Sequence, residues 1–74
     1  MLPAEEMITL STTVANAVEL ALDGAAAEGY AVLLSGIERA RQARTEGKSW
    51  GEELVVRYEK AAGAFARQFG LGRA

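Results

Sequence analysis

The side chains that could do chemistry by their type and spacing are four cations near the middle of the chain, Arg39, Arg41, Arg44 and Lys48, and the indole of Trp50. At helical spacing, three of the four cations share one face. Cations placed this closely can bind the phosphates of a nucleic acid or the carboxylates of an acidic protein. The plainer interpretation, which we favour, is a helix end whose cations offset the negative end of the helix dipole. An acidic protein surface comes second and nucleic acid third, because a net charge of −2 opposes binding to polyanions.

Charge is divided unevenly along the chain. Residues 1–38 contain six acidic and no basic side chains, whereas residues 39–74 contain eight basic and four acidic ones. The first part therefore carries a formal charge of −6 and the second +4. Because opposite charges attract, we expect Arg41 or Arg44 to lie near a carboxylate of the same chain or of a second copy.

Composition excludes several classes of chemistry. The chain has no His and no Cys, so no side chain has an ordinary pKa near 7 and there is no thiolate nucleophile. Neither a Ser–His pair nor a zinc-type site can be built without these residues. Glu19 and Asp23 share a helix face, but a cation site would need further converging ligands. We expect instead a solvent-exposed face, or a salt link to arginines of the second half of the chain. We therefore predict a non-enzymatic protein without a cofactor or a metal.

Apolar residues recur at three- and four-residue steps through most of the chain. This pattern predicts helices near residues 4–22, 25–46 and 49–69. Gly24 is the expected break after the first helix, although the alanines that follow it also allow one continuous helix. Ser49 and Glu52 fit a capping box, in which each residue satisfies an amide at the start of the third helix.

These helices predict a single small all-α domain, residues 1–74, built as a three-helix antiparallel bundle with a loose tail at residues 71–74. The expected core consists of Leu20, Leu33, Ile37, Leu54, Tyr58 and Phe65. A domain this small buries only about 60% of its unfolded surface and has no disulfide or metal to support it. We therefore expect self-association to complete the bundle, as a homodimer with Trp50 at the seam.

The start of the chain is acidic, where a signal peptide would be basic, and no apolar run approaches the length that spans a bilayer. We therefore expect a cytoplasmic protein without a membrane partner.

Residues 16–40 resemble a tetratricopeptide-type helical hairpin in their spacing of small and bulky side chains. The residues that carry the resemblance are Ala17, Leu20, Gly24, Gly29, Leu33, Gly36 and Ile37. The match covers one unit, about a third of the chain, whereas arrays of that family stack several units. The resemblance implies two helices packed antiparallel and a role in binding another protein.

The leading functional prediction is a non-enzymatic helical interaction module that self-associates and can serve as an accessory subunit of a larger partner. The alternative is a small nucleic-acid-binding regulator that uses the basic end of the second helix. Salt separates the two, because phosphate binding weakens steeply as salt is added and apolar association does not.

Overall fold

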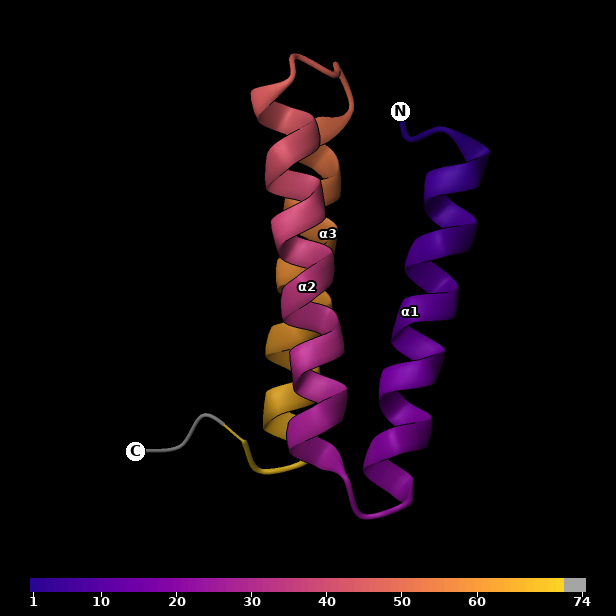
Figure 1. The fold of residues 1–74 in the computed structure, drawn as a ribbon, viewed down its shortest axis with the longest axis vertical. Helices are drawn as coiled ribbons and strands as arrows, with labels where there is room; N and C mark the ends of the chain where they lie inside the picture. Colours follow the sequence, from indigo (N-terminus) through magenta and orange to yellow (C-terminus); the bar gives the residue numbers. More distant parts are fainter. Residues whose placement is uncertain (72–74) are drawn as a thin grey trace.

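Three helices make up the structure, a computed structural model that describes residues 1–71. They are α1 (Ala4–Leu22), α2 (Ala26–Thr45) and α3 (Gly51–Gln68). α1 and α3 run in the same direction and α2 runs against both (Figure 1). The predicted all-α antiparallel bundle is confirmed, and the described residues contain no strand. None of the described helices combines the length and the apolar character needed to cross a membrane.

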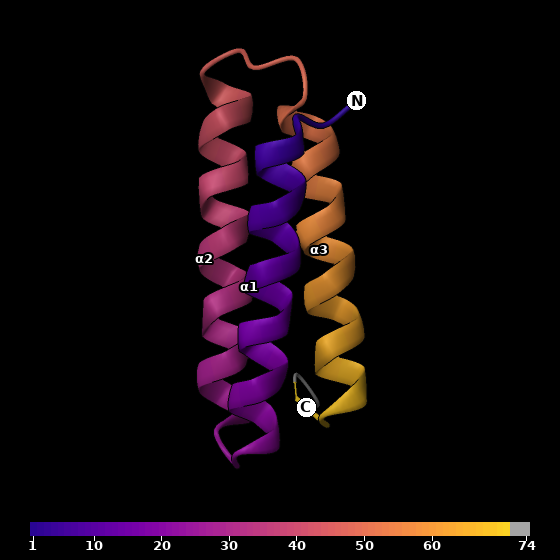
Figure 2. The same cartoon turned by 90° about the vertical axis from the view of Figure 1, so that its right-hand side faces the viewer.

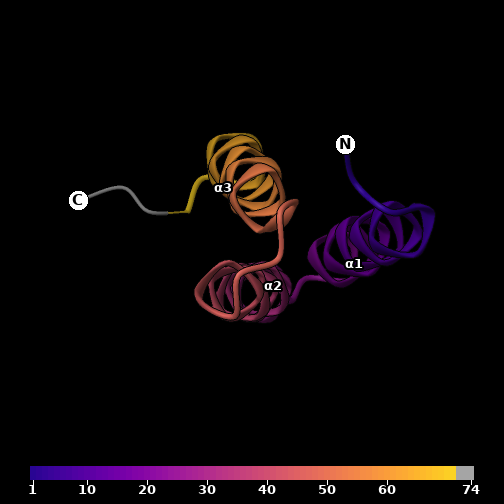
Figure 3. The same cartoon turned by 90° about the horizontal axis from the view of Figure 1, so that it is seen from above.

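α2 is the central helix. It packs closely against both neighbours, whereas α1 and α3 make few contacts with each other. Seen from above, α1 lies to one side of the α2–α3 pair (Figure 3). The first residues of the chain cross from α1 towards the start of α3 (Figure 2), where Leu2 is buried and the Met1 ammonium lies 3.4 Å from a Glu53 carboxylate oxygen. α1 is thus joined to α3 at its beginning rather than along its length.

All three helices end in the same way. Gly24, Gly47 and Gly70 have φ angles of 90°, 88° and 72°, a left-handed conformation that residues with a Cβ rarely adopt. The amide of the residue after each glycine donates to the carbonyl five residues earlier, over 2.8–3.1 Å. These bonds satisfy carbonyls that the helix itself leaves without a partner. The expected break at Gly24 is therefore confirmed.

Leu71 forms part of the last of these turns and packs, half-buried, against the core. The expected loose tail therefore does not include Leu71, and its remaining residues, 72–74, lie outside the described residues.

The start of α3 differs from the expected capping box. The helix begins at Gly51, its N-cap residue is Trp50, and no side chain forms a capping hydrogen bond there. Ser49 lies in the preceding turn, in which the Gly51 amide donates to the Lys48 carbonyl over 3.0 Å. A Cβ on Gly51 would lie 2.6 Å from the backbone of Arg44, so α3 starts where only glycine lets it approach α2. The capping-box prediction was wrong because this close approach, and not a hydroxyl, determines where the helix begins.

The core confirms five of the six predicted residues: Leu33, Ile37, Leu54, Tyr58 and Phe65 are buried. Leu20 was a wrong prediction, because it is only half-buried, and the buried residue of α1 is Ala17. α1 and α2 lie too close together at Ala17 for a leucine to fit there. A Cβ on Gly29 of α2 would lie only 2.5 Å from the Ala17 carbonyl oxygen, so a small residue is needed on each side.

Tyr58 of α3 is the largest of the fully buried side chains, with 1% of its surface exposed. Its ring lies against Gly36 of α2, where an added Cβ would overlap the ring carbons. The Tyr58 hydroxyl accepts a hydrogen bond from the Arg39 guanidinium over 3.5 Å, so the buried phenol is not left without a partner. This contact between a ring and a glycine sets the distance between α2 and α3.

We expect Gly36→Ala to destabilise the protein by about 1–2 kcal/mol, because the overlap with Tyr58 outweighs the gain in helix propensity. Gly63→Ala is the matched control, since a Cβ there meets only the end of the Arg67 side chain at 3.6 Å. The control should be stabilising by about 0.5–1 kcal/mol. Urea denaturation of the three proteins measures both changes. Equal stabilisation by the two substitutions would show that Tyr58 does not occupy this space.

Candidate functional site

The basic residues predicted as a site do not form one surface. Arg39 and Arg41 are two residues apart on α2, so their side chains leave the helix about 160° from each other. Arg41 lies 3.3 Å from a Glu38 oxygen and 3.5 Å from a Glu59 oxygen of α3. Arg44 lies 2.9 Å from a Glu52 oxygen, also of α3. Two of the predicted cations therefore join α2 to α3.

Arg39 has a structural partner of a different kind. Besides its bond to the Tyr58 hydroxyl, its guanidinium lies 6.0 Å from the centre of the Tyr58 ring, at the outer limit of a cation–π contact. Lys48 is exposed and takes part in no ion pair among the described residues. Trp50 is half-buried and packs against the core at the start of α3. Of the five predicted residues, only Lys48 has no side-chain hydrogen bond, ion pair or core packing among the described residues.

The predicted pairing of Arg41 or Arg44 with a carboxylate is confirmed within one chain. The division of charge along the sequence accounts for only one of these pairs, Arg41 with Glu38, because Glu52 and Glu59 belong to the basic part of the chain. The acidic side chains of α1 take part in no ion pair among residues 1–71. Glu5 and Glu6 lie in the first turn of α1, where they complement the helix dipole, but the acids of α1 do not link it to another described helix.

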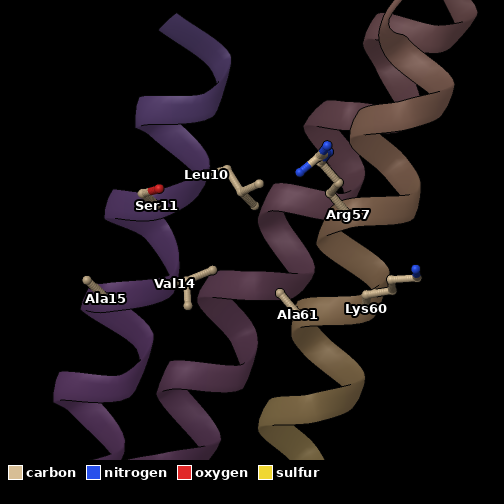
Figure 4. A pocket seen from close by; sticks show the side chains of 7 residues that line it. All are labelled: Leu10, Ser11, Val14, Ala15, Arg57, Lys60 and Ala61. Atoms are coloured by element: carbon tan, nitrogen blue, oxygen red, sulfur yellow. The ribbon is translucent and has the colours of Figure 1, made fainter. Parts of the chain in front are cut away.

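A second region, which the sequence interpretation missed, lies between α1 and α3. It is an open groove of about 540 Å³, lined on one side by α1 and on the other by α3. Its lining residues are Leu10, Ser11, Val14, Ala15, Arg57, Lys60 and Ala61. In Figure 4, Leu10 and Val14 point from α1 into the space between the helices, and Ala61 points towards them from α3. The groove thus has an apolar floor and two cations on its α3 wall.

The side of α1 beside this groove is also apolar. Three of its residues are exposed although they are hydrophobic: Met7 by 46%, Ile8 by 65% and Leu22 by 74%. We call the row Ile8, Ser11, Ala15, Val18 and Leu22 the outer flank of α1. The core uses a different row of the same helix, which includes Leu10, Val14 and Ala17. The apolar part of α1 is therefore wider than one packing partner covers.

Glu53 lies on α3 one turn before Arg57 and contacts two positively charged groups. Arg57 donates two hydrogen bonds to one Glu53 oxygen, over 3.2 and 3.0 Å, and the Met1 ammonium lies near the other oxygen. The bond from Arg57, aided by the ammonium, lowers the pKa of Glu53 from its ordinary value. The carboxylate therefore keeps its charge into more acidic solution.

No group of three or more acidic side chains in the described residues is arranged to hold a metal ion. Comparisons with protein-family models, with curated proteins and with solved structures found no match to the chain. The resemblance of residues 16–40 to a tetratricopeptide-type hairpin therefore stays a prediction. Any functional conclusion must come from the geometry itself.

We expect a double-mutant cycle of Arg44→Ala and Glu52→Ala to give a coupling free energy of about 0.2–1 kcal/mol, as is usual for exposed pairs. Both side chains are about half exposed or more, so the pair should fix the position of the α2–α3 turn more than it stabilises the fold. Denaturation in low and high salt measures the coupling, which should shrink as salt rises. A coupling near zero in low salt would mean that the pair does not form.

Glu53→Gln should destabilise the protein at pH 7, and the difference from the wild type should disappear as the pH falls. The sign follows from the lowered pKa of Glu53. The folded state binds the charged carboxylate, so its contribution to stability is present above the ordinary carboxyl pKa. That contribution is lost as the pH falls through the lowered pKa of the folded state. Thermal unfolding between roughly pH 7 and pH 3 measures the effect. In an Arg57→Gln background the same substitution should have a smaller effect. A difference in stability between Glu53→Gln and the wild type that grows on acidification would contradict the lowered pKa of Glu53.

Proposed function

We propose that this protein is a non-enzymatic helical interaction module that associates with a second copy of itself. The observation that supports the proposal is the open side of the bundle, where α1 leaves an apolar groove against α3 and an exposed apolar flank beside it. An apolar surface of this kind on a small domain is typical of an interaction site.

Size adds a physical reason for association. The protein exposes 4832 Å² of surface, and a standard interface covers about 800 Å² on each partner. Covering the groove and the outer flank would remove apolar atoms from water, at about 25 cal/mol for each Å². The chain has no cysteine with which to stabilise a small core by a disulfide. Association is therefore the remaining route by which this surface can contribute to stability.

The same surface would let the protein act as an accessory subunit, because a helix of a larger partner could enter the groove in place of a second copy. Nucleic-acid binding is the weaker alternative. Arg41 and Arg44 already contact carboxylates of α3, so a phosphate would have to displace those contacts before it could bind. The same competition applies to an acidic protein that approaches this end of α2.

Sedimentation velocity over a range of protein concentration tests the proposal. We expect a monomer–dimer equilibrium and a melting temperature that rises with concentration, because dimerisation stabilises the folded state by mass action. Added salt should leave the dimer intact, as expected for apolar association. A monomer at about 100 µM with a melting temperature independent of concentration would contradict the proposal, because a dimer with a dissociation constant below this concentration would be populated.

A further inference from the structure

The outer flank of α1 has the spacing of a helix–helix seam. Its residues, Ile8, Ser11, Ala15, Val18 and Leu22, follow one another at intervals of three, four, three and four. Alternating steps of this kind place side chains in a single row that faces another helix, as in a coiled coil. Every member except the half-buried Val18 is exposed in the single chain. Apart from Val18, which packs against the edge of the core, the row therefore forms a largely uncovered seam in the described part of the chain.

The middle of this row is small, at Ser11 and Ala15, and its ends are large, at Ile8 and Leu22. Small central residues let two helix backbones approach, and larger residues at the ends can then pack around the crossing point. The groove lies directly beside the small residues, because Ser11 and Ala15 also line it. A helix that covers the seam would therefore enter the groove as well and meet the α3 wall.

The distribution of charge indicates which helix could cover the seam and enter the groove. The α3 wall carries Arg57, which is paired with Glu53, and Lys60, which takes part in no ion pair among the described residues. The Lys60 ammonium points away from α1 in Figure 4, so it would have to turn to meet a helix in the groove. α1 carries no basic residue. Glu5 and Glu19 of α1, with Asp23 directly after the helix, lie on the edge that adjoins the outer flank, at about 100° per residue, whereas Glu6 lies on another face. A second α1 that ran parallel to the first and lay flank to flank with it would turn this acidic edge towards the basic wall.

Resting on the proposed self-association, we infer that the occupant of the groove is α1 of a second copy. The contact is two-fold and isologous: each protomer supplies its α1 to the groove of the other, so one surface serves both roles. The two outer flanks form the apolar centre of the interface, and the acidic edge of each α1 lies against the α3 wall of the partner. The charge of the acidic edge, which forms no ion pair among the described residues, is used between chains.

The first test places a carboxylate in the seam. Ala15→Glu should weaken the dimer at least about tenfold, because each interface then holds two charges in its apolar centre. Thr9→Glu is the matched control: it adds the same charge to the same helix at an exposed position about 120° around the helix from Ala15, outside the outer flank. It should change the dissociation constant less than about twofold, as expected for a surface change outside the interface. Sedimentation gives the constants, and circular dichroism checks that all variants keep their helix content.

If the wild type dimerises and both substitutions have the same small effect, the dimer uses another face. This inference is then overturned while the proposed function stands. If the wild type is a monomer, both fall. A dimer that Thr9→Glu weakens more than Ala15→Glu also overturns the inference, because the contact then lies on the polar side of α1.

The second test exchanges charge. Lys60→Glu and Glu19→Lys should each weaken their own homodimer several-fold in low salt. In each variant the acidic edge and the α3 wall of the partner carry like charges at these positions, and the screening length of about 10 Å at 0.1 M salt grows longer as salt falls, so their repulsion is felt. An equal mixture of the two variants should form a heterodimer tighter than either homodimer, since both of its contacts are again attractive. The preference should fade at roughly 0.5 M salt. A mixture that associates no better than its components would show that α1 does not face the α3 wall of the partner.

Discussion

The close approach of α2 to its two neighbours is the constraint on which the rest of the structure depends. It occurs at three glycines, which face the Ala17 carbonyl, the Tyr58 ring and the Arg44 backbone. No side chain fits at these points without moving its neighbours, so the glycines fix the distance and register of both helix pairs. The burial of Tyr58, and with it the contact from Arg39, follows from this packing. Hydrophobic burial supplies the driving force, but the missing side chains determine the geometry.

The same constraint explains why the bundle is open on one side. α1 approaches α2 closely at Gly29 and makes few contacts with α3, although the Met1 ammonium ahead of α1 lies near Glu53 of α3. An apolar groove is left where a symmetric bundle would have its third seam. The surface proposed for association is thus a product of how the helices pack, and it needs no specialised loop or cofactor.

The helices and most of the core could be predicted from the sequence, because periodicity and glycine positions are local signals. Helix ends were placed within two residues, and the errors at Ser49 and Leu20 have one origin. At both points a glycine lies against the backbone of another helix, Gly51 against Arg44 and Gly29 against Ala17, and that contact is not visible in the local sequence. The candidate site was harder to predict. A cluster of cations such as Arg41 and Arg44 looks free in a sequence, whereas its partners, Glu52 and Glu59, lie on the next helix. The signal for the groove was present in the steps from Ile8 to Leu22, a row that adjoins the core row of the same helix.

Burial is shared unequally among the helices, and this has a consequence for the order in which the molecule opens. α1 contributes one buried residue of its own, whereas α2 contributes five and α3 six, and α2 and α3 are also joined by ion pairs. Opening free energies differ between such units, and the unit with less buried surface exchanges its amide hydrogens first. α1 is then the outermost foldon of the chain, hinged at Gly24 on a more persistent α2–α3 hairpin. Detachment of α1 takes apart the groove that it forms with α3, so a second copy bound in that groove would oppose this opening.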